Sequence, residues 1–226
     1  MRRTIDPFLD QLRQSALRMG SLAEAILAKA LRSVWDRDPK LAEEVQRDDL
    51  EIDRLDVAID ELVTEALALQ SPVANDLRRI LAVRAMVSDL ERVGDLARNI
   101  AKSAVRLAHR SALPLPPGLE ELADQTTRAL CDALDSFADS DAAKARAVIE
   151  ADDAVDAAED ALIRAIIAEA AAHPDWTPQE VDLILIAKNL ERVGDHATNI
   201  AEEVIFLAEA RIVRHHAKLG GGSAGR

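Results

Sequence analysis

Apolar residues recur along this chain with the period of an α-helix, and strand-like alternation is absent. Between residues 39 and 70 the apolar positions follow one another mostly three or four residues apart: Leu41, Val45, Ile52, Leu55, Ile59, Leu62, Val63 and Ala66. Such spacing places them on one face of a helix, the face that packs into a core. The pattern therefore predicts an all-α fold.

Prolines indicate where the helices begin. Four pairs predict an N-cap residue with proline at the first helical position: Asp6-Pro7, Asp38-Pro39, Ser71-Pro72 and Thr177-Pro178. Glu180 follows Thr177 by three residues, which predicts a capping box. The proline-rich segment 113–118 is the expected linker. Six helices are predicted, at about 5–36, 39–70, 72–110, 118–138, 141–172 and 178–216.

The chain contains an internal repeat. Residues 90–101 and 190–201 are identical except at Leu96/His196 and Arg98/Thr198. Three helices, the proline linker and three further helices therefore predict two tandem pseudo-symmetric three-helix bundles. Their expected ranges are 5–110 and 118–216, followed by a disordered Gly/Ser-rich tail at 217–226.

Composition narrows the class of protein. The 226 residues are 49% hydrophobic and include no tyrosine, which favours helices over strands. With 28 Lys and Arg against 41 Asp and Glu, the net charge of −13 argues against nucleic acid and anionic lipid as partners. No apolar run is long enough for membrane insertion. A single cysteine, Cys131, and no signal-like N-terminus predict a cytoplasmic protein.

Acidic residues lie four apart in both copies of the repeat, which places them on one helix face. In the first copy Asp49 takes a position where the helical period expects an apolar residue. The rows are Asp49 and Asp53 with Glu91, Asp95 and Asn99, and in the second copy Asp152 and Asp156 with Glu191, Asp195 and Asn199. Packing each pair of helices together would bring several carboxylates to a partly dry seam.

Carboxylates gathered at such a seam repel one another, so a positive charge is needed to stabilise them. Oxygen ligands without cysteine suit hard cations: Fe(III), Mn(II), Mg(II) or Ca(II), with Zn(II) also possible. Gly94 and Gly194 recur beside the carboxylates, although glycine costs about 1 kcal/mol inside a helix. Their presence would allow a neighbouring helix or an ion to approach the backbone. The alternative is a solvated acidic face that Arg92 and Arg192 neutralise.

Two other functions compete with metal binding by a regulator. One is a purely structural interaction module whose acidic rows pair with a partner's basic residues. The other is a ferritin-type di-metal enzyme, which would need Glu-x-x-His on two helices; here Glu169 precedes Ala172, and His173 comes one residue too late. His196 is expected to be an ordinary surface or packing residue because its counterpart is Leu96. Cys131 is expected in the core, and no catalytic or organic-cofactor site is predicted.

Both copies of Leu-Glu-Arg-Val-Gly-Asp-x-Ala-x-Asn-Ile-Ala follow an Asp-x-x-x-Asp helix, and over residues 5–215 the chain resembles the PhoU family of phosphate-transport regulators. The resemblance implies a cytoplasmic, homodimeric regulator, not an enzyme. Its implied partners are the phosphate ABC transporter, through the ATPase subunit, and the sensor histidine kinase of phosphate starvation. It would restrain both when phosphate is plentiful.

The resemblance also implies metal ions on the acidic motifs, iron or zinc clusters in some members and magnesium or manganese in others. Carried over residue by residue, the metal ligands would be Asp49, Asp53, Glu91, Asp95, Asn99, Asp152, Asp156, Glu191, Asp195 and Asn199. The second copy has Ala154 where the first has Glu51, which predicts a weaker or differently populated second site.

Overall fold

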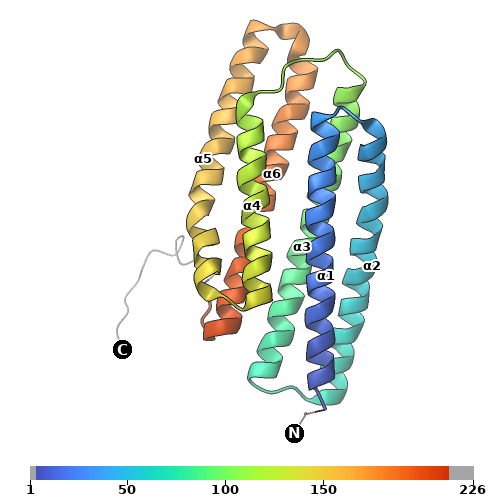
Figure 1. The fold of residues 1–226 in the computed structure, drawn as a ribbon, viewed down its shortest axis with the longest axis vertical. Helices are drawn as coiled ribbons and strands as arrows, with labels where there is room; N and C mark the ends of the chain where they lie inside the picture. Colours follow the sequence, from blue (N-terminus) through green and yellow to red (C-terminus); the bar gives the residue numbers. More distant parts are fainter. Residues whose placement is uncertain (1–3, 214–226) are drawn as a thin grey trace.

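The computed structural model describes residues 4–213, and within them the secondary structure is helical, with no strand. The elements are α1 Asp6–Trp35, α2 Pro39–Gln70, α3 Asn75–Ala108, α4 Pro117–Asp139, α5 Ala142–Ala172, the 3₁₀ helix η1 Pro174–Trp176 and α6 Thr177–Glu209. Helices α1–α3 form one bundle and α4–α6 the other, side by side with their long axes aligned (Figure 1). The predicted all-α fold of two tandem three-helix bundles is confirmed. The tail predicted at 217–226 lies outside the described residues.

Aspartates cap the second helix of each bundle in the same way. The carboxylate of Asp38 accepts hydrogen bonds from the backbone N–H groups of Lys40 (2.9 Å) and Leu41 (3.2 Å). Asp141 accepts from Ala143 (2.9 Å) and Lys144 (3.1 Å). Each cap satisfies two amides that have no partner inside the helix. The cap predicted at Asp38 is confirmed, and the repeat preserves it.

The caps predicted at Asp6 and Ser71 are wrong. Helix α1 includes Asp6, and the residue before it, Ile5, takes the N-cap position without a side-chain hydrogen bond. Ser71 instead ends α2 in the left-handed region, with φ 44°, and α3 begins only at Asn75. The chain must reverse direction between the antiparallel helices α2 and α3. This reversal takes the four residues 71–74, so α3 cannot begin directly after Ser71.

The last helix begins within one residue of the predicted start, but its predicted cap and its predicted end are wrong. Thr177 lies inside α6, and its hydroxyl donates to the Pro174 carbonyl (2.7 Å), so it closes the preceding 3₁₀ turn rather than capping α6. Glu180 makes no capping box, because neither of its carboxylate oxygens has a hydrogen-bond partner among residues 4–213. The helix ends at Glu209, where Ala210 adopts a φ of 58°. Residues 210–213 are therefore not helical, and 214–216 lie outside the described part.

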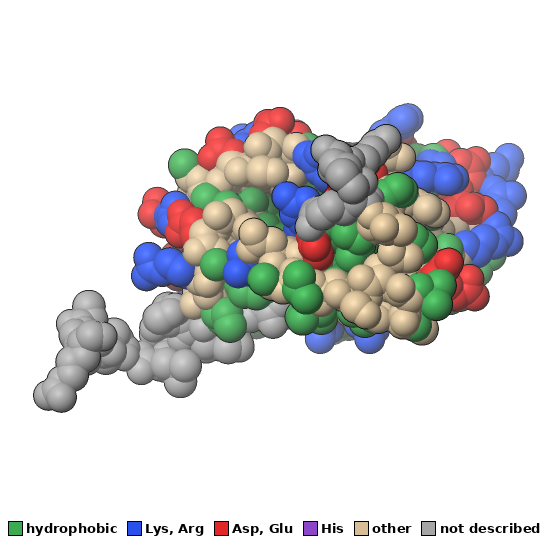
Figure 2. Space-filling view, turned by 90° about the horizontal axis from the view of Figure 1, so that it is seen from below, with side chains coloured by type: hydrophobic (Ala, Val, Ile, Leu, Met, Phe, Trp, Pro, Cys, Tyr) green, Lys and Arg blue, Asp and Glu red, His purple; other side chains and the backbone are tan. Residues whose placement is uncertain are grey.

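A single hydrophobic core runs through both bundles, with α3 packed along α6 at its centre and α1 against α4. On α2 the buried face matches the predicted period, since Val45, Ile52 and Ile59 are buried. None of the helices within residues 4–213 is long and apolar enough to cross a membrane. On the end of the molecule seen in Figure 2, acidic and basic side chains are interspersed.

Candidate functional site

The acidic row of the first repeat lies along the seam between α2 and α3. Asp49 is only 1% exposed, because the two helices approach closely at Gly94. A Cβ at Gly94 would stand 2.7 Å from Asp49 Oδ1. Glycine at this position therefore makes room for the buried carboxylate. Asp53, Glu91 and Asp95 are partly exposed on the same seam.

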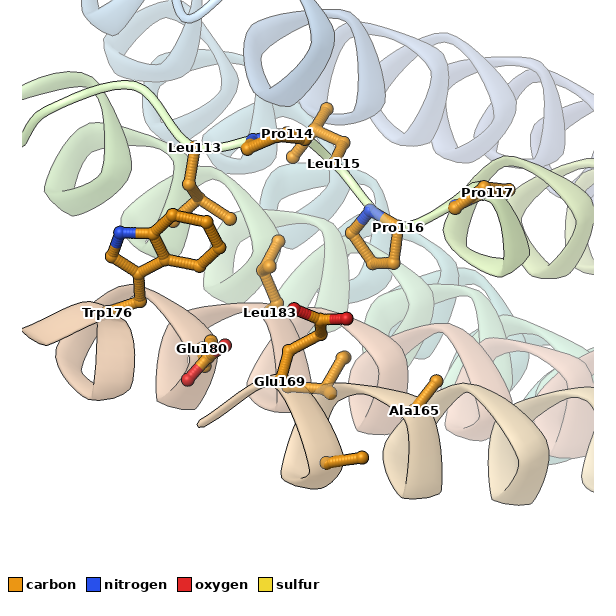
Figure 3. Close-up of a pocket in the computed structure, with 12 residues that line it drawn as sticks. Leu113, Pro114, Leu115, Pro116, Pro117, Ala165, Glu169, Trp176, Glu180 and Leu183 are labelled. Atoms are coloured by element: carbon orange, nitrogen blue, oxygen red, sulfur yellow. The ribbon is translucent and has the colours of Figure 1, made fainter. Parts of the chain in front are cut away.

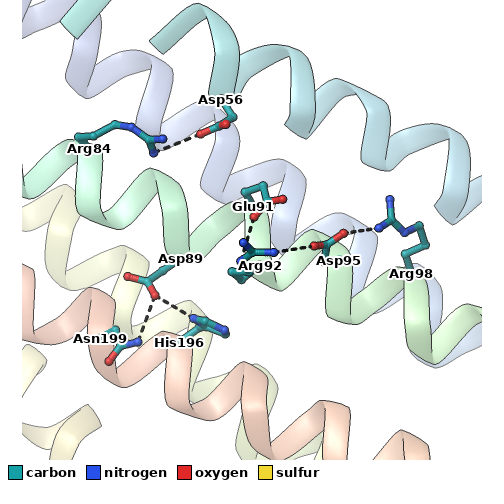
Figure 4. Close-up of polar contacts among 9 residues, drawn as sticks. All are labelled: Asp56, Arg84, Asp89, Glu91, Arg92, Asp95, Arg98, His196 and Asn199. Atoms are coloured by element: carbon teal, nitrogen blue, oxygen red, sulfur yellow. Dashed lines mark hydrogen bonds and ion pairs between the residues drawn. The ribbon is translucent and has the colours of Figure 1, made fainter. Parts of the chain in front are cut away.

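Two arginines of α3 neutralise the first seam. Arg98 Nη1 lies 2.5 Å from Asp49 Oδ2, and the same guanidinium also pairs with Asp95. Arg92 contacts Glu91 at 3.4 Å and Asp95 at 3.2 Å (Figure 4). The sequence had suggested Arg92 for this role but not Arg98. In this repeat the protein's own cations compensate the acidic row.

The seam between α5 and α6 in the second repeat has a cation in a different place: Lys188 of α6 pairs with Glu159 of α5 at 2.8 Å. Thr198 replaces Arg98, and its hydroxyl donates to Asp152 at 3.1 Å. Within residues 4–213, no lysine or arginine forms an ion pair with Asp152, Asp156 or Asp195. The two repeats therefore carry equivalent carboxylates in different electrostatic settings.

Burial and mutual repulsion raise the pKa values of acidic side chains in both seams. Burial, followed by the neighbouring Asp195, raises the pKa of Asp156 and Glu191 above the ordinary range. Burial also raises the pKa of Asp152, and the Thr198 hydrogen bond opposes that rise. In the first repeat burial raises the pKa of Asp49 against the opposing charge of Arg98. Each seam thus disfavours its own negative charge. Arg98 opposes the rise at Asp49 in the first seam, and Lys188 opposes it at Glu191 in the second.

The two asparagines are engaged outside the acidic seams. Asn99 accepts a hydrogen bond from Lys102 (3.3 Å) along α3. Asn199 donates to Asp89 of the other repeat (3.1 Å), and His196 Nδ1 lies 2.8 Å from the same oxygen (Figure 4). Asp89 was not predicted as a site residue. The only sequence signal for this link between the repeats was the exchange of leucine for histidine at position 196.

The fit of a metal ion differs between the seams. As the side chains stand, no three His, Cys, Asp or Glu side chains within residues 4–213 are arranged to hold a metal ion. In the first seam the donors already pair with arginine, so that seam fits a metal poorly. The second offers four carboxylates on two packed helices, none of them in an ion pair with a residue of the described range 4–213, and such a donor set suits a hard metal ion. The four are Asp152, Asp156, Glu191 and Asp195.

Cys131 does not provide a reactive thiol. The residue is half-buried rather than fully in the core. Burial, together with a hydrogen bond to Glu24, raises the pKa of the Cys131 thiol to about 12. The thiol is therefore protonated at neutral pH, and a protonated thiol is a poor nucleophile.

Comparison with known proteins finds similarity to one family over both bundles. The family profile described as "PhoU domain" matches residues 16–104 and 119–204. A phosphate-specific transport system accessory protein PhoU homolog from Xylella fastidiosa is 38% identical over 205 residues, covering 91% of this chain and 86% of the relative. The Escherichia coli phosphate-specific transport system accessory protein PhoU is 29% identical over 207 residues, covering 92% and 86%.

Solved structures show the same architecture. The crystal structure of PhoU from Pseudomonas aeruginosa superposes with a TM-score of 0.89 at 32% identity, covering 92% of this chain and all of that one. The phosphate transport system regulatory protein PhoU from Streptococcus pneumoniae gives a TM-score of 0.84 at 29% identity, covering 93% and 99%. The Xylella and Escherichia relatives are described as accessory proteins of a phosphate-specific transport system, and the Streptococcus protein as a regulatory protein of the phosphate transport system.

Proposed function

Because this chain belongs to the PhoU family, we propose that it is a cytoplasmic regulatory adaptor of a phosphate-specific transport system, and not an enzyme. It restrains phosphate uptake and starvation signalling when phosphate is plentiful. Its partners in this role are the ATPase subunit of the phosphate ABC transporter and a sensor histidine kinase, which it contacts as a homodimer. The match of both repeats to accessory proteins of that system carries the proposal.

Deletion of the gene in its own host tests the regulatory role. Under phosphate excess, we expect the deletion to increase uptake of radiolabelled phosphate and expression from a starvation promoter, and the intact gene to reverse both. Unchanged uptake and unchanged expression would contradict the proposal. Co-purification from membranes should recover the ATPase subunit and the kinase, and light scattering of the purified chain should give the mass of a dimer.

We further propose that the second seam is the one that binds a metal ion: iron, zinc, magnesium or manganese. Burial raises the pKa of Asp156 and of Glu191, and the charge of the neighbouring Asp195 raises both further. No basic side chain within residues 4–213 pairs with Asp152, Asp156 or Asp195. A bound cation would remove the repulsion, draw the side chains together and stiffen the pairing of α5 with α6. This stiffened face is the surface offered to partners.

Exchanging the residue types at the equivalent positions Arg98 and Thr198 tests this assignment. Untagged protein purified without chelator should contain stoichiometric metal by elemental mass spectrometry. Thr198→Arg should lose that metal, because a guanidinium then competes for the carboxylates, whereas Arg98→Thr should gain metal at the first seam. Thr64→Arg adds the same charge at an exposed position of α2 and should retain the parent's metal. A metal-free parent, or metal retained in Thr198→Arg, would contradict the assignment.

The ion pairs of the first seam favour a second candidate, a structural role without metal for that repeat. Arg98 and Arg92 already compensate Asp49, Glu91 and Asp95. If this candidate applied to the whole protein, metal-free protein would still bind transporter membranes. That binding would then weaken steeply with salt, because exposed charges are screened within about 10 Å at 0.1 M.

A further inference from the structure

A cavity of about 540 Å³ lies at the end of the molecule where the linker joins the repeats. The segment 113–117 forms one wall, and the end of α5, η1 and the start of α6 form the others (Figure 3). Most of the lining is apolar, including Leu113, Ile166, Trp176 and Leu183. A space of this size and character is typical of sites for small organic molecules.

Glu180 is the exceptional residue of this cavity. It is 2% exposed, and neither carboxylate oxygen has a hydrogen-bond partner within the described residues. Ile80 stands as far before Glu91 as Glu180 stands before Glu191, so it occupies the equivalent position of the first repeat, and it is fully buried. The second repeat therefore places an acid where the first has a core residue. A buried carboxylate without a partner is costly and calls for a ligand or another explanation.

A second acid and an aromatic ring complete the chemistry of the cavity. Glu169, at the end of α5, lines the cavity and leaves 63% of its side chain exposed, which places it at the rim (Figure 3). Burial raises the pKa of Glu180, and the charge of Glu169 acts in the same direction. His173, which does not line the cavity, stacks on Trp176 with ring centroids 4.2 Å apart. This contact fixes the orientation of the indole.

We propose that this cavity binds an organic cation, with an ammonium or guanidinium group beside Glu180 and an apolar stem against Trp176 and the linker. Two carboxylates and an aromatic face attract a cation and repel an anion. The net charge of −13 raises the local concentration of cations around the whole molecule. Because the linker forms one wall, an occupied cavity ties the junction of the repeats to α5 and α6.

Tryptophan fluorescence provides the test, carried out on the full chain with Trp35→Phe so that only Trp176 reports. The probes are n-hexylammonium, hexan-1-ol and hexanoate, which share a stem and differ in charge. We expect hexylammonium to bind at least about tenfold more tightly than hexanol, equivalent to about 1.4 kcal/mol, and hexanoate to bind least. Glu180→Gln should reduce the affinity for hexylammonium to that of hexanol and leave hexanol binding unchanged.

Two controls make the result specific. Asp175→Asn removes the same charge from η1 at an exposed residue outside the lining, and should leave hexylammonium binding nearly unchanged at physiological salt. Unchanged hexanol binding in Glu180→Gln shows that the cavity is intact. Equal affinity of the parent for hexylammonium and hexanol, or no effect of Glu180→Gln, would overturn the proposal.

A further titration distinguishes the source of the cation. The peptide acetyl-Leu-Lys-Leu-amide carries the same ammonium group on a polypeptide, as a partner protein would present it. Tighter binding of the peptide than of hexylammonium supports a partner's lysine as the occupant, and the reverse order supports a free amine. Failure of both probes to bind at millimolar concentration would overturn the proposal.

Discussion

At Gly94 the backbone of α3 lies so close to α2 that a methyl group would displace the Asp49 carboxylate. A Cβ there would be 2.7 Å from Asp49 Oδ1 and 3.0 Å from Ile52 Cδ1, whereas at Gly194 the nearest atom, Val155 Cγ1, is 3.2 Å away. Overpacking costs about 1–3 kcal/mol, and alanine returns about 1 kcal/mol of helix propensity.

We therefore expect Gly94→Ala to lower the free energy of unfolding by up to about 2 kcal/mol. Gly194→Ala should change it by less than about 0.5 kcal/mol, because the helix propensity offsets a milder contact. Urea denaturation of the two variants and the parent measures both. Equal losses in the two variants would show that the close approach at Gly94 does not control the stability of the first seam.

The buried carboxylate of Glu180 gives a pH dependence whose sign follows from its raised pKa. The folded state binds the proton more tightly than the unfolded state does. Stability is therefore lost as the pH rises from the ordinary glutamate pKa through the raised value in the folded protein, and the loss is complete above it. Glu180→Gln removes this penalty.

We expect Glu180→Gln to be more stable than the parent at neutral pH, because the amide is neutral and avoids the cost of ionising a buried carboxylate, which is about 1.4 kcal/mol for each unit by which the pKa is raised. The difference should shrink as the pH falls toward 4. Urea denaturation between pH 4 and pH 8 measures it, with Asp175→Asn as the control for loss of an exposed charge. A difference that stays constant over this range would show that Glu180 does not titrate between the two states.

The positions of the acidic rows could be predicted from the sequence, and their partners could not. Helical periodicity alone places Asp49 and Asp152 beside an apolar stripe. Whether a long side chain such as Arg98 reaches Asp49 depends on the distance between two helices, which no single-helix pattern encodes. The exchange of Arg98 for Thr198 was visible in the repeat, but its electrostatic consequence required the packed structure.

At the scale of elements, helix interiors were easier to predict than helix ends. The caps at Asp38 and Asp141 are local, since each side chain bonds amides two and three residues ahead. The starts of α3 and α6 depend instead on how the chain reverses between packed helices. Ser71 and Thr177 both have side chains suited to capping. In the folded chain, however, Ser71 lies in the turn after α2, and Thr177 is already part of α6.

The matching caps of α2 and α5 provide a quantitative prediction. We expect Asp38→Ala and Asp141→Ala each to cost about 1 kcal/mol, because each leaves two helix amides without their side-chain acceptor. The two sites belong to different bundles and share no partner, so the double variant should lose the sum. Guanidinium denaturation of the two single variants and the double variant measures this. A double variant that loses much more than the sum would indicate coupling between the two helix starts.

At the scale of the whole molecule, the two bundles are joined by a common core and by polar contacts that the internal repeat did not indicate. The sequence divides at the linker into similar halves, but the hydrophobic core is continuous across them. Polar side chains also join α3 to α6: Asp89 contacts His196 and Asn199, and Arg106 Nε lies 2.6 Å from the buried Asp182. These links could not be predicted from the repeat, since they connect positions that are not equivalent in the two copies.

A continuous core predicts that the bundles unfold together. Separating them would expose the apolar faces of α3 and α6 and leave Asp182 without Arg106, so a half-unfolded state should be unstable. We expect one calorimetric transition, with the calorimetric enthalpy equal to the van't Hoff enthalpy. Two resolved transitions would contradict this expectation.

Arg106→Met sharpens the test, because it keeps most of the side-chain length while removing the charge that pairs with Asp182 across the bundles. In a cooperative molecule this change lowers the temperature of the single transition, since both repeats lose the stability that the pair contributes. If the repeats were independent, only the loss of the hydrogen bond from Arg106 to Ser103 within α3 (2.8 Å) would remain, and the transition temperature would change little. The response of the transition temperature therefore measures how strongly a change in one repeat is transmitted to the other.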